Sequence, residues 1–232
     1  MSIIKSIIDN DFYKFTMQFG VTKLYPDVMA RYKFINRGEH ESPDGFAEEL
    51  QNEINAMASL ALTKDEKEFF STNCPYLSPA YLDFLQGYRY DPAEVKISQN
   101  GSDVEVLVEG YWYRTILWEV PILCLISEIF YKLTNAQRIS NGEITKRTKD
   151  KVDLYNRLGV IVAEFGTRRR HSYEVHDIVM KELTNHKGKS FVGTSNVHFA
   201  HKYGVKPIGT HAHEWFMFHG ARYGFKIVNL IS

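Results

Sequence analysis

The order of apolar and polar positions differs between the first and second halves of the chain. Near the N-terminus, segment 10–25 carries apolar residues at roughly helical spacing, and Pro26 follows it. These apolar positions are Phe12, Phe15, Phe19 and Leu24. Segment 28–36 alternates with a period of two, which is typical of a strand. We therefore expect a helix over 10–25 and then a strand.

Capping and turn residues predict the elements that come next. Ser42 followed by Pro43 resembles a helix start, and we expect that helix to run to about residue 62. Thr63 and Glu66 spell a capping box for a short helix ending near residue 70, and another helix is expected over 78–86. Two alternating runs, 94–98 and 103–110, flank Asn100-Gly101, so they predict an antiparallel hairpin.

The second half reads as two long helices followed by short strands that alternate with helices. The helices are expected over 122–135 and 143–159, and strands at 160–166, 190–195 and 206–210 each precede a further helix. This alternation predicts parallel βα units. We expect an α+β domain over 1–120, then a helical connection and the first βα units of an irregular α/β barrel over 121–232. Three units cannot close a barrel, so we expect an incomplete barrel from a fragment or a short relative of a longer protein.

Composition places the chain among folded globular proteins. Its 232 residues are 44% hydrophobic and 24% charged, and its 28 basic side chains equal its 28 acidic ones. That balance argues against a nucleic-acid-binding protein, and no apolar run reaches the length of a membrane span. Cys74 and Cys124 are far apart and form no CxxC pair, so we expect reduced thiols in a cytoplasmic protein.

Chemistry is expected at the carboxyl ends of the parallel strands, where loops and helix N-termini face a ligand. Three stretches lie there: EFGTRRRHS (164–172), VGTSN (192–196) and IGTHAHEW (208–215). Each contains Gly-Thr, a pair that can bring amide and hydroxyl donors close to a phosphate or carboxylate.

Arginine and histidine residues in these stretches allow more than one interpretation. Arg168, Arg169 and Arg170 form either an anion site or a solvated basic patch, and only one or two of them are expected to face a ligand. His213 is either catalytic or simply packed, or it forms a zinc site with His211 and His219.

Three other side chains have a structural and a functional interpretation. Phe165 and Tyr13 are either core residues or aromatic contacts for a flat heterocycle, and Ser195 is either a helix cap or a donor to a carboxylate.

Taken together, these blocks resemble the N-terminal part of a nicotinate phosphoribosyltransferase. The resemblance covers nearly the whole chain, through DNDFYKFTM, YKFINRG, EFGTRRRHSYE, FVGTSNVHFAHKYGVKPIGT and HAHEW. Members of that family are commonly longer, with an N-terminal α+β domain packed on an irregular βα barrel and an active site built from both subunits of a homodimer. The resemblance implies that nicotinate and phosphoribosyl pyrophosphate form nicotinate mononucleotide and pyrophosphate in NAD salvage, coupled to ATP hydrolysis, with Mg²⁺ bound through substrate phosphates.

The same resemblance assigns roles to individual residues. His213 matches the histidine phosphorylated by ATP, and Glu214 or a backbone carbonyl would orient its ring. Phe165 matches the aromatic that stacks on the pyridine, and Arg168 matches a phosphate-binding arginine. Tyr13 matches a tyrosine that reaches the pyridine from the partner subunit. The remaining candidates, on the acid-binding side of the pocket, are Ser195 and Thr210.

Substrate choice and the possible loss of activity remain open at this point. A related nicotinamide-using enzyme has an aspartate where this chain has Ser195, and an aspartate would repel the carboxylate of nicotinate, so we favour nicotinate. A nicotinamide-using relative is one alternative. A fragment that only folds and dimerises is another, and a zinc protein is a third.

Overall fold

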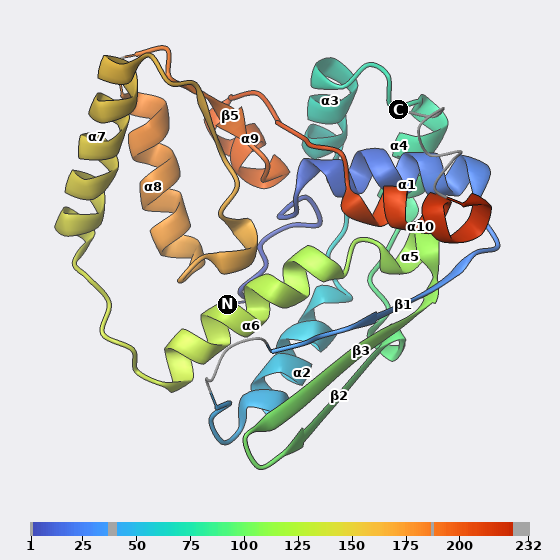
Figure 1. Cartoon of the computed structure of the whole chain (residues 1–232). Helices are drawn as coiled ribbons and strands as arrows, with labels where there is room; N and C mark the ends of the chain where they lie inside the picture. The colour runs from blue at the N-terminus through green and yellow to red at the C-terminus, as the bar shows by residue number, and fades with distance from the viewer. Residues whose placement is uncertain (1, 37–40, 187, 225–232) are drawn as a thin grey trace.

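The computed structural model describes residues 2–36, 41–186 and 188–224, which form an α+β arrangement (Figure 1). Within those ranges, no helix combines the length and apolar character needed to cross a bilayer. The elements of the first part are α1 (Phe12–Leu24), β1 (Met29–Lys33), α2 (Phe46–Met57), α3 (Lys64–Asn73), α4 (Pro79–Gly87), η1 (Pro92–Glu94), β2 (Val95–Asn100), β3 (Asp103–Tyr111) and α5 (Trp112–Thr115).

The first part is built around a three-stranded antiparallel sheet in the order β1-β3-β2. The hairpin predicted at Asn100-Gly101 is confirmed, because Asn100 pairs with Asp103 and Gly101 has a φ of 59°. The predicted capping box is also confirmed: Thr63 Oγ1 accepts from the Glu66 amide, and the Glu66 carboxylate accepts from the Thr63 amide.

Two expectations in this part were wrong. The second helix begins at Phe46 and not near Pro43, because Gly45 adopts a left-handed conformation with a φ of 77° and turns the chain before the helix starts. That helix also ends at Met57 and not near residue 62. Helix α1 is buried around most of its middle, including the polar Lys14 and Gln18.

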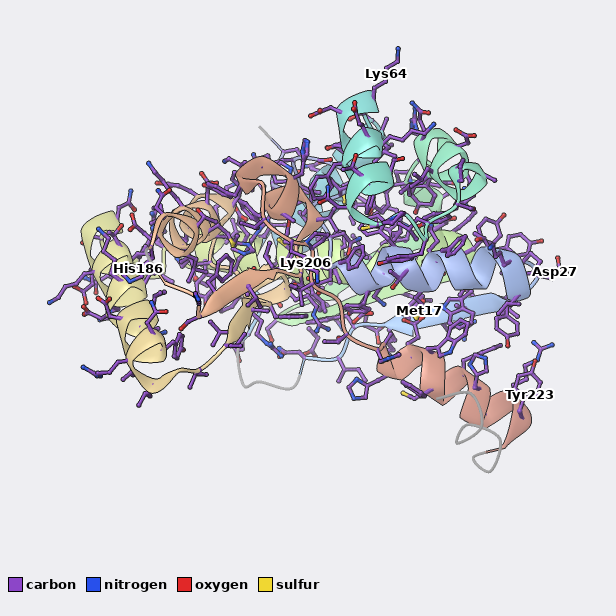
Figure 2. All side chains as sticks on the ribbon, turned by 90° about the horizontal axis from the view of Figure 1, so that it is seen from above. Met17, Asp27, Lys64, His186, Lys206 and Tyr223 are labelled. Atoms are coloured by element: carbon purple, nitrogen blue, oxygen red, sulfur yellow. The ribbon has the colours of Figure 1, made fainter. Side chains whose placement is uncertain are left out.

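The second part consists of α6 (Glu119–Leu133), α7 (Asn141–Leu158), β4 (Val162–Glu164), η2 (Thr167–Arg169), α8 (Tyr173–Asn185), β5 (Phe191–Thr194), α9 (Val197–Tyr203) and α10 (His213–Tyr223). Helices α7 and α8 lie side by side, and α10 lies along α1 in both views (Figures 1 and 2). The prediction of parallel βα units is confirmed for β4 and β5, which pair in parallel. The expected end of the last helix near residue 225 lies outside the described residues.

The strand expected over 206–210 is reduced to a single parallel bridge between Thr194 and Pro207. The two hydrogen bonds of the bridge flank the proline: the Thr194 amide donates to the Lys206 carbonyl at 3.2 Å, and the Ile208 amide donates to the Thr194 carbonyl at 2.8 Å. The approach is nevertheless close. A Cβ on Gly193, whose φ is 147°, would lie 2.1 Å from the Lys206 carbonyl oxygen, so this position requires glycine.

One hydrophobic cluster extends from Ile4 to Val197 and includes Ile122, Leu125 and Ile129 of α6. It therefore contains residues on both sides of the boundary expected near residue 120. Cys74 and Cys124 are both free and buried in this cluster, as expected for reduced thiols.

Candidate active site

The start of α1 is the point at which the strand-end segments meet. The Phe12 amide donates to the Ser195 carbonyl at 2.7 Å, and Asp11 forms a β-bridge with Asn196. Ser195 Oγ donates to Asp11 Oδ1 at 2.8 Å, and Ser195 itself is fully buried. Burial raises the pKa of Asp11 above its ordinary value, although the Ser195 hydroxyl and the Arg168 guanidinium oppose this. The Ser195 hydroxyl proton is thus already committed to Asp11 and does not point to a ligand.

The three arginines have three different environments. Arg168 Nε lies 3.7 Å from Asp11 Oδ2, its Nη1 lies 3.3 Å from Glu119 Oε1, and its side chain is 36% exposed. Arg169 is exposed. Arg170 is buried and makes two hydrogen bonds to the carboxylate of Asp9. Arg168 is therefore the arginine that combines contact with the α1 start and access to solvent.

The Gly-Thr pairs differ from the expectation that all three present donors to a ligand. The Gly166 amide donates to Glu164 Oε1, and Thr194 Oγ1 donates to Glu164 Oε2 at 2.6 Å. Thr167 is fully buried, and its Oγ1 accepts from Asn196 Nδ2 at 3.2 Å. Only Thr210 of the three threonines is exposed. The Gly-Thr pairs at 166–167 and 193–194 therefore hydrogen-bond within the protein, because Glu164 binds both turns.

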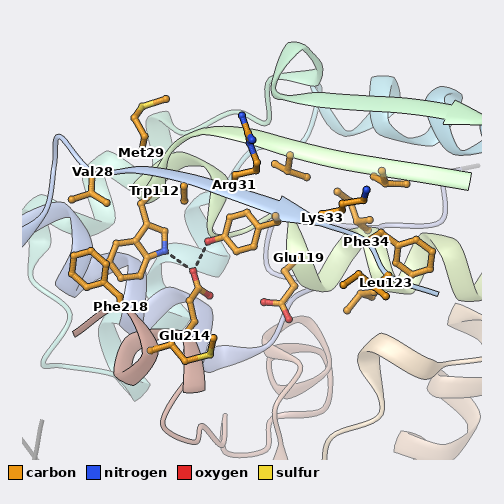
Figure 3. A pocket seen from close by; sticks show the side chains of 17 residues that line it. Val28, Met29, Arg31, Lys33, Phe34, Trp112, Glu119, Leu123, Glu214 and Phe218 are labelled. Carbon is orange, nitrogen blue, oxygen red and sulfur yellow. Dashed lines mark hydrogen bonds between the residues drawn. The ribbon is translucent and has the colours of Figure 1, made fainter. Parts of the chain in front are cut away.

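The first two residues of α10, His213 and Glu214, have different surroundings. His213 is the first residue of the helix, is exposed, and makes no hydrogen bond through its ring within the described ranges. Glu214 points into a cavity, where Oε1 accepts from Trp112 Nε1 at 2.5 Å and from the Tyr32 hydroxyl (Figure 3). Glu214 Oε2 accepts from Lys14 Nζ at 2.8 Å. The expectation that Glu214 orients the His213 ring is therefore not met in this structure.

The other two histidines do not complete a zinc site with His213. His219 is buried, with Nδ1 2.8 Å from the Trp215 carbonyl and Nε2 2.8 Å from the Tyr25 hydroxyl. Donation from Nδ1 to that carbonyl leaves Nε2 as the acceptor, so neither nitrogen is left for a metal. His211 is exposed and its ring lies 5.8 Å from that of Phe216. In the part of the chain that the structure describes, no three histidine, cysteine or acidic side chains are grouped as metal ligands.

The remaining candidates lie around the same region. Tyr13 and Thr210 line one cavity of about 180 Å³ together with His211 and Trp215. Tyr13 is only 8% exposed, and burial raises its pKa to about 12, so the phenol stays neutral at physiological pH. Phe165 is 39% exposed at the end of β4. The structure thus brings Tyr13, Arg168 and Ser195 together at the start of α1. Thr210 and His213 lie on the segment that follows α9 and leads into α10.

Comparison with known proteins identifies this arrangement. Residues 8–127 match the model of the nicotinate phosphoribosyltransferase N-terminal domain, and residues 160–224 match that of the nicotinate phosphoribosyltransferase family. The chain belongs to the nicotinate phosphoribosyltransferase family.

Relatives of known sequence and structure agree with that membership. A nicotinate phosphoribosyltransferase of Chromohalobacter salexigens is 58% identical over 99% of the chain and 59% of the relative. The crystal structure of one from Porphyromonas gingivalis superposes with a TM-score of 0.94 at 44% identity, over 99% of this chain and 59% of that one. A putative one from Saccharomyces cerevisiae gives a TM-score of 0.93 at 31% identity, over 100% and 60%. The chain thus spans about 59% of the length of the first of these relatives.

This member of the nicotinate phosphoribosyltransferase family uses residues at the site that the sequence patterns did not single out. Glu119 at the start of α6 links Arg168 to Lys14, and Glu164 binds two Gly-Thr turns. Burial alone would raise the pKa of Glu119, but Lys14 and Arg168 hold it below its ordinary value. In the sequence, Glu119 and Glu164 stand out only as charged residues inside apolar runs. That pattern does not predict which side chains they bind.

Glu214 also lines a larger cavity, of about 750 Å³. It is lined by β1, by Val106 and Val108 of β3, and by Trp112, and Figure 3 shows Glu119 and Glu214 directed into it. The two acids therefore line this cavity, and His213 is not among its lining residues.

Proposed function

We propose that the protein to which this chain belongs transfers the phosphoribosyl group of phosphoribosyl pyrophosphate to nicotinate, in NAD salvage, with coupled ATP hydrolysis through a phosphohistidine at His213. The observation that carries the proposal is the convergence of the first helix, the β4 loop, the β5 loop and the α10 start, in a chain that belongs to the family. The parallel strands would then be the first units of a barrel that the longer relatives continue, and a homodimer would complete the site. The protein would act in the cytoplasm.

The surroundings of His213 support the role of phosphate acceptor. Its ring is exposed and has no partner within the described ranges, so a nitrogen lone pair is available for attack on ATP. Ala212, at the N-cap of α10, offers no side chain to the amides of the first turn. Those amides and the positive end of the helix dipole favour a phosphate at this place.

The other candidates supply binding. Arg168 is the accessible cation near the α1 start, which suits the pyrophosphate leaving group, and Phe165 presents an exposed ring for the pyridine. Thr210 would line the acid-binding side of the pocket, and Tyr13 would reach the pyridine in the site of the partner subunit. Mg²⁺ would be held mainly by substrate phosphates, where it supplies charge neutralisation, since this ion needs only one or two protein carboxylates.

Ser195 remains the residue proposed to select nicotinate over nicotinamide. The Ser195 hydroxyl donates to Asp11. Ser195 would therefore favour nicotinate by being a neutral residue, which adds no second negative charge beside Asp11 to repel the substrate carboxylate. Donation to the substrate would require the hydroxyl to rotate away from Asp11.

The test is product formation from nicotinate and phosphoribosyl pyrophosphate, with and without ATP, by this chain and by a full-length protein that contains it. We expect the full-length protein to form nicotinate mononucleotide faster with ATP, and to carry an acid-labile phosphate that is absent from His213→Ala. If the full-length protein forms no nicotinate mononucleotide from nicotinate and phosphoribosyl pyrophosphate, with or without ATP, the proposed activity is refuted. Label that persists in His213→Ala would refute the histidine assignment, and activity of the full-length protein alone would identify this chain as a noncatalytic part.

A further inference from the structure

Lys14 is an unusual residue for the middle of a buried helix surface. Its side chain is 1% exposed, and Nζ donates to Glu214 Oε2 at 2.8 Å and pairs with Glu119 Oε2. The rings of Tyr13 and Tyr32 lie 5.4 Å and 5.9 Å from Nζ. Burial alone would lower the pKa of Lys14, but Glu214 and Glu119 raise it above its ordinary value, so the side chain stays charged.

Each of its two acidic partners connects to a different part of the site. Glu214 directly follows His213 in α10 and is also bound by Trp112 and Tyr32. Glu119 pairs with Arg168 at 3.3 Å, in the loop after β4. Lys14 is therefore linked to the proposed phosphate-binding Arg168 through Glu119, and it binds Glu214, the residue next to the proposed phosphate acceptor His213.

We propose that Lys14 is a positioning residue that sets the place of His213 relative to Arg168, by holding Glu214 and Glu119 with one ammonium group. The inference rests on the proposed phosphorylation of His213 and adds a determinant of that step. Without the cation, two carboxylates that are 24% and 29% exposed would repel each other across the cavity. Separation of the two acids would move the first turn of α10 away from the Arg168 loop.

The later turns of α10 have contacts of their own. Displacement of the helix start can therefore be distinguished from loss of packing of the whole helix. The Phe218 ring lies 4.6 Å from the ring of Trp112 and 4.7 Å from that of Tyr25, the C-cap residue of α1. These aromatic contacts do not involve Lys14. Loss of the cation is therefore expected to loosen the start of the helix while its later turns remain packed on Trp112 and Tyr25.

The experiment compares Lys14→Met with Lys23→Met in the full-length protein. Lys23 lies on the same helix and is exposed, so it controls for loss of a lysine from α1. For Lys14→Met we expect ATP-dependent labelling of His213 to slow by about tenfold to a hundredfold, as a displacement near 1 Å can cause. Product formation without ATP should change by much less, so the ratio of the two rates should fall. Lys23→Met should leave both rates unchanged.

Two further measurements keep the proposal independent of simple unfolding. In Lys14→Met, backbone hydrogen exchange of Trp215, whose amide donates to the Ala212 carbonyl at 3.1 Å, should accelerate more than that of residues 218–220. The double variant Lys14→Met with Glu214→Gln should recover part of the labelling rate, because it removes one of the two repelling charges. Equal losses of both rates in proportion to the folding midpoint, or unchanged exchange at the Trp215 amide, would overturn the proposal.

Failure of the proposed function gives a different result. In that case the unsubstituted protein itself shows no labelling of His213. The exchange measurement would still decide whether Lys14 holds the start of α10.

Discussion

Two ionic clusters join the N-terminal segment to the loop after β4, and they differ in how much water reaches them. In the first, Arg170 and Asp9 are 1% and 0% exposed and are joined by two hydrogen bonds, and Asn196 donates to the same carboxylate at 2.8 Å. In the second, buried Lys14 binds Glu119, which also binds the 36% exposed Arg168. Arg168 and Arg170 are two residues apart, yet one is sealed inside and the other faces solvent.

The difference indicates separate roles for the two clusters. A buried bidentate pair fixes two segments and is closed to solvent. An arginine that is 36% exposed and shares one of its two acids, Glu119, with a lysine retains donors for an incoming anion. We infer that the Asp9–Arg170 pair holds the architecture and that the Lys14–Glu119–Arg168 cluster serves the site.

The largest effect is expected from breaking the buried pair. Arg170→Met leaves Asp9 without its cation in the interior, which should lower the free energy of unfolding by about 3–5 kcal/mol. Denaturant titration of the variant against Arg169→Met measures this, because Arg169 is exposed and serves as the matched control. Equal midpoints for the two variants would contradict the structural role of Arg170.

Acid should weaken the same pair. Arg170 outweighs the effect of burial and lowers the pKa of Asp9 from 3.8 to about 2. Because the folded pKa is depressed, the stabilisation is present above about pH 4 and is lost as the pH falls towards 2, at a cost of about 2 kcal/mol. Unfolding free energies measured over this interval should show a shallower slope in Asp9→Asn. An identical slope in both proteins would argue against the assignment.

Ser195→Asp sharpens the view of the site. It places a second carboxylate where Ser195 Oγ now lies, 2.8 Å from Asp11 Oδ1. Repulsion should raise the pKa of one of the two acids and lower stability near neutral pH by about 1–2 kcal/mol. The ratio of kcat/KM for nicotinate to that for nicotinamide should also fall in the full-length protein, and an unchanged ratio would remove Ser195 from substrate selection. Ser195→Ala is the control that removes the hydroxyl without adding charge.

Arg168→Met should have the smallest effect on folding. The side chain is 36% exposed and its nearest acids are 3.3 Å and 3.7 Å away, so stability should change by no more than about 1 kcal/mol. Product formation should nevertheless fall by about a hundredfold if the guanidinium binds the pyrophosphate. A variant with full activity would place the phosphate contact elsewhere.

Much of the fold could be predicted because its signals are local. The capping box at Thr63, the hairpin at Asn100-Gly101 and the helices after each parallel strand all depend on neighbouring residues. The start of α2 was misplaced because Gly45, not Ser42, decides where the chain turns. The third strand was overestimated: the structure shows a single bridge there, between Thr194 and Pro207.

The sequence by itself determined the order of elements, the family resemblance and the segments in which the site residues lie. The tertiary structure decided which arginine is buried, that Ser195 donates to Asp11, and that Glu214 binds Lys14. The physical reason is sequence separation: Lys14 and Glu214 are 200 positions apart, and Asp11 and Ser195 are 184 apart. Local patterns place a charge on an element, but only the packed chain brings its partner within hydrogen-bonding distance.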